Sequence, residues 1–408
     1  MPGRIEVLGK HTDYAGGHSI VTAVEQGFCL VCVAQDEPHI TVLAAETGEE
    51  AHFPFGPGLE PHHGHWSNYP MTVARRLARN FPEARRGARI AFASDLPPAS
   101  GMSSSSAMMV ATYLALAAAN DLESHPLYRR SFPDALTLAA YLGTIENGQS
   151  FGELAGDRGV GTFGGSEDHT AILCSRAGHL GQFKYCPARF ERYIAVPPGH
   201  LFAVAFSGVV AEKTGAAQEL YNRASQRVGA IVQAWRRATG RSEVYLADVL
   251  ASGPGAADEL RRILAHSGEG SFGSPELRQR LEHYVAENEE IIGPAGDALG
   301  RGDLDGFGRL VDRSQELTTS VLGNQVPQTV ALARLARQHG ARAASAFGAG
   351  FGGSVWALAP ASGMAGFLEA WAAAYRSAFA AEAAGARFFA TQAGPAACEV
   401  GRYTERLK

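Results

Sequence analysis

The chain has 408 residues, 46% of them hydrophobic, which is ordinary for a globular protein with two or three domains. A formal net charge of −5 gives no basis for binding nucleic acid or an anionic membrane surface. The apolar stretch at residues 108–119 is too short to span a bilayer, and five cysteines without a paired spacing pattern indicate a reducing compartment. We therefore expect a cytoplasmic protein with no nucleic-acid or membrane partner.

The hydrophobic pattern predicts mixed α and β structure. Buried strands are indicated by four β-rich apolar runs, at residues 18–34, 88–94, 201–208 and 352–360. Residues 108–119 have the length of a buried helix, and residues 274–340 contain helices that begin at Ser, Asp or Pro start signals. We expect the Gly- and Ser-rich residues 253–273 to form a connector and the Ala-rich residues 359–390 to form a helix.

Two polar clusters are explained by ordinary surface structure. The short basic pairs Arg75–Arg76 and Arg85–Arg86 favour solvated helix faces over a binding patch. The three histidines within residues 62–65 lie in a Pro- and Gly-rich stretch without cysteines, which favours a surface loop over a metal site.

The sequence SDLPPASGMSSSSAMMVA, residues 94–111, places prolines, a glycine and four serines directly before an apolar helix. The first turn of a helix has unpaired N–H groups and partial positive charge, and small residues before it let an anion approach the backbone. The stretch therefore has the features of a phosphate cradle, although it lacks the GK[ST] end of a Walker A loop. A flexible connector or a plain helix cap would have a similar composition.

Two further segments contain residues suited to a ligand site. SAFGAGFGGSVWAL, residues 345–358, holds four glycines within six residues, which permits positive φ and close approach of the backbone. PGRIEVLGKHTDYAGG, residues 2–17, concentrates ionisable side chains between glycines. Such a density of ionisable groups is unusual in a core.

These three segments, in this order, resemble the GHMP kinase superfamily, which includes galactokinase, homoserine kinase and mevalonate kinase. GRIEVLGKHTDYAGG is similar to the galactokinase signature, and the resemblance continues through residues 66–70, 159–173 and 212–225. It implies an α+β GHMP kinase fold, with an N-terminal ribosomal-protein-S5-like domain, a C-terminal ferredoxin-like domain and the active site between them. We expect the ATP- and sugar-binding domain to span residues 1–195 and the C-terminal domain to span residues 196–408.

The resemblance implies transfer of the γ-phosphoryl group of ATP, with Mg²⁺, to the anomeric hydroxyl of a monosaccharide. Asp168 matches the family's catalytic aspartate, which would accept or orient the hydroxyl proton. Arg4 matches the arginine beside it, which would keep that carboxylate ionised and offset charge in the transition state.

The phosphate and metal sites are implied by the same resemblance. Glu146 and Ser105 resemble the ligands of Mg²⁺, which prefers hard oxygen donors. The spacing between Glu146 and Asp168 is longer than in the family, so Glu153 and Glu167 remain alternatives to Glu146. The nucleotide-binding residues would be Pro97, Ser100, Gly101, Ser103, Ser104, Ser105, Ser106 and Gly350.

Four residues resemble the sugar contacts of galactokinases: Lys10, His11, Asp13 and Tyr221. Tyr221 would equally fit a half-buried core tyrosine. Lys10 stands where galactokinases have a glutamate that contacts the C6 hydroxyl. An ammonium there would suit a uronic acid such as galacturonic acid, whereas a Lys10 that pairs with Glu6 or another acid would leave a neutral hexose as the substrate.

Two other functions are disfavoured by the motifs. A kinase for a different small alcohol, such as mevalonate, is disfavoured by HTDYAGG at residues 11–17. A non-catalytic galactokinase-like sugar sensor is disfavoured because the serines at 103–106 are all present, where such sensors tend to lose residues. The expected partners are therefore ATP and a small sugar. The identity of the sugar, the oligomeric state and a start upstream of Met1 stay open.

Overall fold

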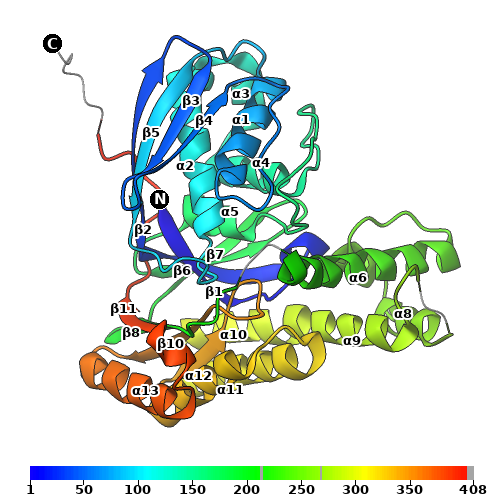
Figure 1. The fold of residues 1–408 in the computed structure, drawn as a ribbon. Helices are drawn as coiled ribbons and strands as arrows, with labels where there is room; N and C mark the ends of the chain where they lie inside the picture. The colour runs from blue at the N-terminus through cyan, green and yellow to red at the C-terminus, as the bar shows by residue number, and fades with distance from the viewer. Residues whose placement is uncertain (212–214, 267–268, 402–408) are drawn as a thin grey trace.

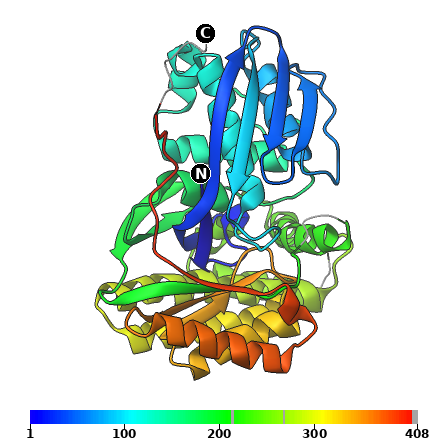
Figure 2. The same cartoon turned by 60° about the vertical axis from the view of Figure 1, so that its left-hand side comes forward.

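Two β-sheets with helices packed against them organise the molecule (Figures 1 and 2). The computed structural model describes residues 1–211, 215–266 and 269–401. The four runs expected to be strands all lie in these sheets, so the prediction of mixed α and β structure is confirmed.

The first sheet belongs to the N-terminal half. Its strand order is β4–β3–β5–β2–β6–β7, with β1 paired to β2, and all pairs are antiparallel except β3 with β5. β2 is long enough to pair with β1 and β6 through its first half and with β5 through its second half. The strands are β1 (Pro2–Leu8), β2 (His18–Gln35), β3 (His39–Ala44), β4 (Glu49–Pro54), β5 (Gly87–Ser94), β6 (His179–Lys184) and β7 (Arg189–Ala195).

Helices cover one face of this sheet (Figure 1). The apolar stretch expected to be a buried helix is α2, which packs on β2 and β5 and encloses a core containing Met109, Tyr113 and Leu142. The opposite face of β2 is open to solvent at Val31 and Val33. The helices of this half are η1 (Asp13–Ala15), α1 (Asn68–Asn80), α2 (Ser104–Ala119), η2 (Leu122–Ser124), α3 (Pro126–Ser131), α4 (Ala135–Asn147) and α5 (Glu167–Cys174).

The second sheet is antiparallel throughout, in the order β11–β8–β10–β9. Strand β1 connects the two halves, because Ile5 and Val7 share a core with Val204 and Trp356. The expected boundary after residue 195 falls between the last strand of the first sheet and the first strand of the second. The strands are β8 (His200–Phe206), β9 (Ala343–Ala346), β10 (Ser354–Pro360) and β11 (Arg387–Thr391).

The remaining helices form two groups. Helices α6 to α9 extend to the right of the sheets in Figure 1 around a core that includes Trp235, Leu260 and Tyr284, while α11 to α13 pack on the second sheet. No helix within the described ranges is long and apolar enough to cross a membrane. The elements are α6 (Gly215–Thr239), α7 (Leu246–Ala251), α8 (Ala256–His266), α9 (Ser274–Val285), η3 (Ala286–Ile291), α10 (Ile292–Gly300), α11 (Leu304–Leu317), η4 (Thr318–Leu322), α12 (Pro327–Gln338), α13 (Met364–Ala378) and η5 (Glu382–Ala384).

One prediction from local composition was wrong, and another was confirmed only for residues 364–378, which form α13. The expected connector at residues 253–273 contains helix α8, because Leu260 and Leu264 give it an apolar side that is buried in the core of the helical group. The expected helix at residues 359–390 is divided into the end of β10, α13 and β11. Strand β11 forms because β8 offers it a hydrogen-bonding edge, which local composition does not reveal.

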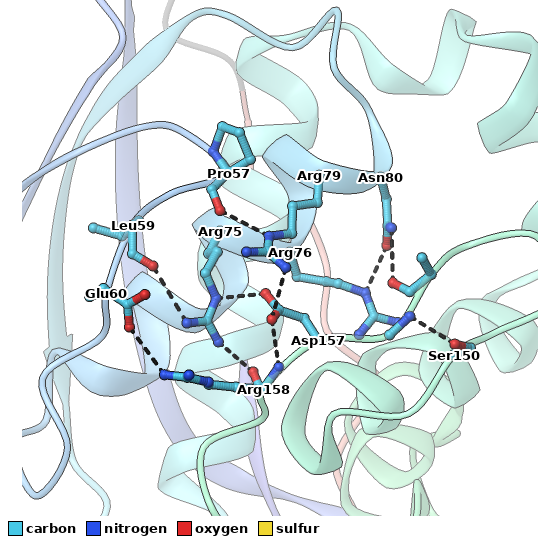
Figure 3. Close-up of polar contacts among 12 residues, drawn as sticks. Pro57, Leu59, Glu60, Arg75, Arg76, Arg79, Asn80, Ser150, Asp157 and Arg158 are labelled. Carbon is cyan, nitrogen blue, oxygen red and sulfur yellow. Dashed lines mark hydrogen bonds and ion pairs between the residues drawn. The ribbon is translucent and has the colours of Figure 1, made fainter.

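The prediction that Arg75 and Arg76 are solvated was also wrong. Both side chains are buried and point from α1 toward residues 148–159, the long segment that follows α4 (Figure 3). Arg75 Nε lies 2.7 Å from Asp157 Oδ2, and Arg76 donates to the backbone carbonyl of Gln149 at 2.7 Å. Two buried guanidinium groups therefore hold residues 148–159 against α1.

We expect Asp157→Asn to lower the free energy of unfolding by about 3 kcal/mol, because it leaves the buried Arg75 guanidinium without its counter-ion. Urea unfolding followed by circular dichroism measures the change. Asp36→Asn is the matched control, since Asp36 and its partner Arg86 are largely exposed and such pairs contribute about 0 to 1 kcal/mol. Equal unfolding midpoints for the two variants would contradict this assignment.

Candidate active site

A pocket of about 460 Å³, including the solvent at its mouth, opens where β1, η1, α5 and α6 meet the glycine-rich loop before β10. It collects most of the residues predicted to bind or activate the sugar. The predicted residues in its lining are Arg4, His11, Asp13, Glu146, Asp168 and Tyr221. Segments separated by more than 200 residues in the sequence thus meet at one place.

Arg4 and Asp168, which both line this pocket, form an ion pair. Arg4 Nε lies 2.7 Å from Asp168 Oδ1, and the Arg4 side chain also donates to the backbone carbonyl of Gly101 at 2.6 Å. Arg4 is buried on β1, while Asp168 lies in the first turn of α5 and keeps some exposure to the pocket. The arginine therefore links the aspartate to the serine-rich loop.

Glu146 lies at the end of α4, beside the start of α2. Its Oε2 accepts a hydrogen bond from Ser106 Oγ at 3.1 Å, and its Oε1 accepts one from Thr162 Oγ1 at 3.2 Å. The same Ser106 hydroxyl is 3.3 Å from Asp168 Oδ2, so Glu146 and Asp168 are neighbours despite their long sequence separation. Glu153, one alternative to Glu146, is exposed and faces Arg130 away from the pocket lining.

Asp13, His11 and Tyr221 form another wall of the pocket. Asp13 accepts hydrogen bonds from the backbone N–H groups of Tyr14, at 2.8 Å, and Glu167, at 3.2 Å. Burial raises the pKa of Asp13 to about 6, which leaves the carboxyl mostly ionised at neutral pH. The ring of Tyr221, from α6, lies 5.3 Å from the ring of His11. Residues 212–214, at the start of the expected 212–225 segment, lie outside the described residues.

Lys10 is placed differently from the other three residues that resemble sugar contacts. Its side chain is buried away from the pocket lining, and Nζ donates to Ser314 Oγ of α11 at 3.2 Å. The carboxyl of Glu287 accepts from the same Ser314 hydroxyl at 3.0 Å. Burial raises the pKa of Glu6, and the nearby Lys10 charge opposes part of that rise. The ammonium therefore faces carboxyl groups of the protein.

The serine-rich loop has donors available for a ligand. Helix α2 begins at Ser104, within the run of four serines, so its first-turn N–H groups have no acceptor within the helix. Ser103 before it has a φ of 59°, and the buried hydroxyls of Ser100 and Ser103 have no hydrogen-bond partner in the described structure. Ser104 and Ser105 are half-buried, as are Pro97 and Gly101.

The glycine-rich loop packs directly on the serine-rich loop. A Cβ on Gly348, whose φ is +80°, would stand 2.8 Å from the carbonyl oxygen of Gly101, so a side chain there would displace one loop or the other. A side chain at Gly350 is excluded by a different neighbour, because a Cβ there would stand 2.3 Å from the carbonyl oxygen of Asn324. The residue between them, Ala349, lines the pocket.

The residues present fit a phosphate and a magnesium ion. Unpartnered buried hydroxyls at a helix N-terminus are suitable donors to phosphate oxygens. Within the described ranges, no three His, Cys, Asp or Glu side chains are grouped to hold a metal by themselves. Mg²⁺ is commonly bound by one or two protein oxygens together with phosphates and water, and Glu146 and Ser105 suit that arrangement.

The lining also includes two glutamates that were not predicted as catalytic or sugar-binding residues. Glu6 lies two positions after Arg4 on β1, and since alternate residues of a strand face the same side, this spacing was the available signal. Glu167, considered above only as an alternative metal ligand, precedes Asp168 at the start of α5 and also lines the pocket.

Comparisons with known proteins agree with this architecture. The model of the GHMP kinase N-terminal domain matches residues 68–152, and the model of the GHMP kinase C-terminal domain matches residues 297–377. The galactokinase galactose-binding signature matches residues 2–34. Galactokinase from Chloroflexus aggregans is 28% identical over 378 residues, which cover 92% of this chain and 86% of the relative. Galactokinase from Actinobacillus pleuropneumoniae is 26% identical over 371 residues, which cover 88% and 84%.

Solved structures show the same fold. The crystal structure of Lactococcus lactis galactokinase complexed with galactose superposes with a TM-score of 0.78 at 21% identity, covering 97% of this chain and 92% of that one. A mevalonate kinase from L. major, in complex with R-mevalonate, superposes less well, with a TM-score of 0.57 at 16% identity over 97% and 95% of the two chains. With both domain models and the galactokinase signature matched in order along it, the chain carries the two domains of the GHMP kinase superfamily and is similar to its galactokinase members.

Proposed function

We propose that the protein transfers the γ-phosphoryl group of ATP to the anomeric hydroxyl of a monosaccharide, as a sugar 1-kinase of the galactokinase type. The observation that carries this proposal is the Arg4–Asp168 pair, which places a carboxylate in the lining of the pocket and ties it to the serine-rich loop. The galactokinase relatives, which align over most of the chain, support the same activity.

Asp168 is proposed to accept or orient the proton of the attacking hydroxyl. The nearby Arg4 guanidinium holds one carboxylate oxygen, which leaves the other directed toward the Ser106 hydroxyl and the pocket. The same positive charge is placed to offset negative charge that develops on the transferring phosphoryl group.

The nucleotide phosphates are proposed to lie against the serine-rich loop. First-turn N–H groups of α2 and the hydroxyls of Ser100 and Ser103 would donate to phosphate oxygens. Glu146 and Ser105 would hold Mg²⁺, which neutralises phosphate charge when bound. The glycine-rich loop keeps the serine-rich loop in position through the contact between Gly348 and Gly101.

His11, Asp13 and Tyr221 are proposed to bind the sugar. Asp13 has acceptor capacity beyond its two backbone donors, so it suits vicinal hydroxyls. The hypothesis of a uronic acid substrate is not carried forward, because the Lys10 ammonium faces Ser314 and neighbouring carboxyls. We place the protein in a reducing cytoplasm, which its five free thiols support.

We expect ADP release that depends on both ATP and a monosaccharide in a coupled assay. Product analysis by ³¹P nuclear magnetic resonance should show the phosphate on the anomeric oxygen. The panel includes galactose, other aldohexoses, galacturonic acid and mevalonate. Turnover of mevalonate alone would identify a different GHMP kinase, and binding of sugar and ATP without turnover would identify a sensor.

A further inference from the structure

Two carboxyl groups in the pocket form no ion pair with any of the described residues. Glu6 and Glu167 are each only 5% exposed, and both line the pocket. Glu6 Oε1 is buried and has no hydrogen-bond partner in the described structure. Buried acidic side chains are normally paired with a cation or fully hydrogen-bonded, so these two require an explanation.

The other ionisable groups of the pocket are already engaged. Asp168 pairs with Arg4, and Asp13 accepts two backbone N–H groups. Glu146 accepts two hydroxyls. Among the described residues of the lining, Arg4 is the only lysine or arginine, and its charge acts on Glu6 and Glu167 as well as on Asp168. Lys10 acts on Glu6 from outside the lining while its Nζ donates to Ser314. Neither Glu6 nor Glu167 therefore has an ion-pair partner of its own among the described residues.

The electrostatics of the pair support this conclusion. Burial raises the pKa of Glu6 to about 7. Burial and the neighbouring Glu6 carboxyl raise the pKa of Glu167 well above its usual range. Ionising both Glu6 and Glu167 is therefore costly in free energy unless a cation binds beside the two carboxyls. A primary ammonium has three N–H donors and one positive charge, and it satisfies two carboxylates at once.

We infer that Glu6 and Glu167 bind an ammonium group carried by the substrate, so that the preferred acceptor is an amino sugar with a free amine. This inference rests on the proposed sugar kinase function and names its substrate class. A neutral hydroxyl would fill the same space but would bring no positive charge to let both carboxyls ionise. On binding, the protonated amine displaces a proton that the two carboxyls hold, and this proton is released to solvent.

The first test compares the wild-type protein's activity on a hexose, on its aminodeoxy derivatives with the amine at C2, C3, C4 or C6, and on their N-acetylated forms. We expect at least one free amino sugar to exceed the parent hexose about tenfold or more in kcat/KM, because charge-assisted hydrogen bonds are stronger than neutral ones. N-acetylation of that sugar should remove the advantage, since it removes the charge. A parent hexose preferred over every amino derivative would overturn the inference while leaving the sugar kinase function intact.

Calorimetric binding separates this inference from the proposed activity. We expect the amino sugar to bind more tightly than the hexose, with proton release detected by repeating the titration in buffers of different ionisation enthalpy. If it binds this way but no sugar is phosphorylated, the kinase function is wrong and the ammonium site stands. Equal or weaker binding of every amino sugar would refute the ammonium site.

Substitutions assign the effect to the two residues. Glu6→Gln and Glu167→Gln keep the side-chain shape and remove the charge, and each should lower the ratio of amino-sugar to hexose kcat/KM about tenfold. Glu153→Gln is the matched control, because Glu153 is exposed and pairs with Arg130 outside the pocket. An unchanged ratio in both pocket variants would contradict the assignment, and the wild-type comparison decides the inference if a variant does not fold.

Discussion

Asp168→Asn should lower the turnover number by about 10²- to 10⁴-fold, because an amide cannot accept the hydroxyl proton that the carboxylate accepts. The substitution keeps the shape of the side chain and its place beside Arg4 Nε, which now lies 2.7 Å from Oδ1. Nucleotide affinity should stay within a few-fold of wild type, since the serine-rich loop is unchanged. Steady-state kinetics and titration with a nucleotide analogue measure the two quantities separately.

The control for this prediction is Asp305→Asn. Asp305 lies in the first turn of α11 with a side chain that is 81% exposed, so its substitution should leave turnover unchanged. An Asp168→Asn protein that retains more than a tenth of the wild-type rate would exclude Asp168 as the base or orienting group.

Ser105→Leu should abolish measurable turnover and weaken nucleotide binding more than tenfold. Ser105 is the second residue of α2, half-buried beside the buried Ser106 that bridges Glu146 and Asp168. A branched apolar side chain there occupies the space in which phosphate oxygens would meet the first-turn N–H groups, and it removes a hydroxyl proposed to contact Mg²⁺. Equilibrium binding of a fluorescent ATP analogue gives the affinity.

Two companion variants separate the causes of this loss. Ser105→Ala removes the hydroxyl without adding bulk, so it should raise the Mg²⁺ concentration needed for half-maximal rate while preserving nucleotide binding. Ser124→Leu introduces the same bulk at an exposed serine of η2 and should behave as wild type. Wild-type nucleotide affinity in Ser105→Leu would show that the phosphates lie elsewhere.

The amino-acid sequence alone determined the features that depend on local chemistry. A helix start close to the four serines could be predicted, because small polar residues before an apolar run favour a helix N-terminus, and α2 begins at Ser104. The strands β2, β5, β8 and β10 could be predicted from apolar β-rich runs of the right length. Arg4 and Asp168 were recognised as partners only through motifs, and the structure places them in contact.

Only the tertiary structure decided how charged residues are used, since a charge in the sequence carries no record of what surrounds it. Arg75 and Arg76 look like a solvated helix face, yet a segment more than 70 residues later covers them. Lys10 lies within the sugar-binding motif, yet its ammonium donates to Ser314 of α11 and lies outside the pocket lining. Glu6 and Glu167 become neighbours only because β1 and α5 meet. Burial then disfavours the ionised form of both carboxyls unless a cation binds beside them, which is not so for either residue in an isolated chain.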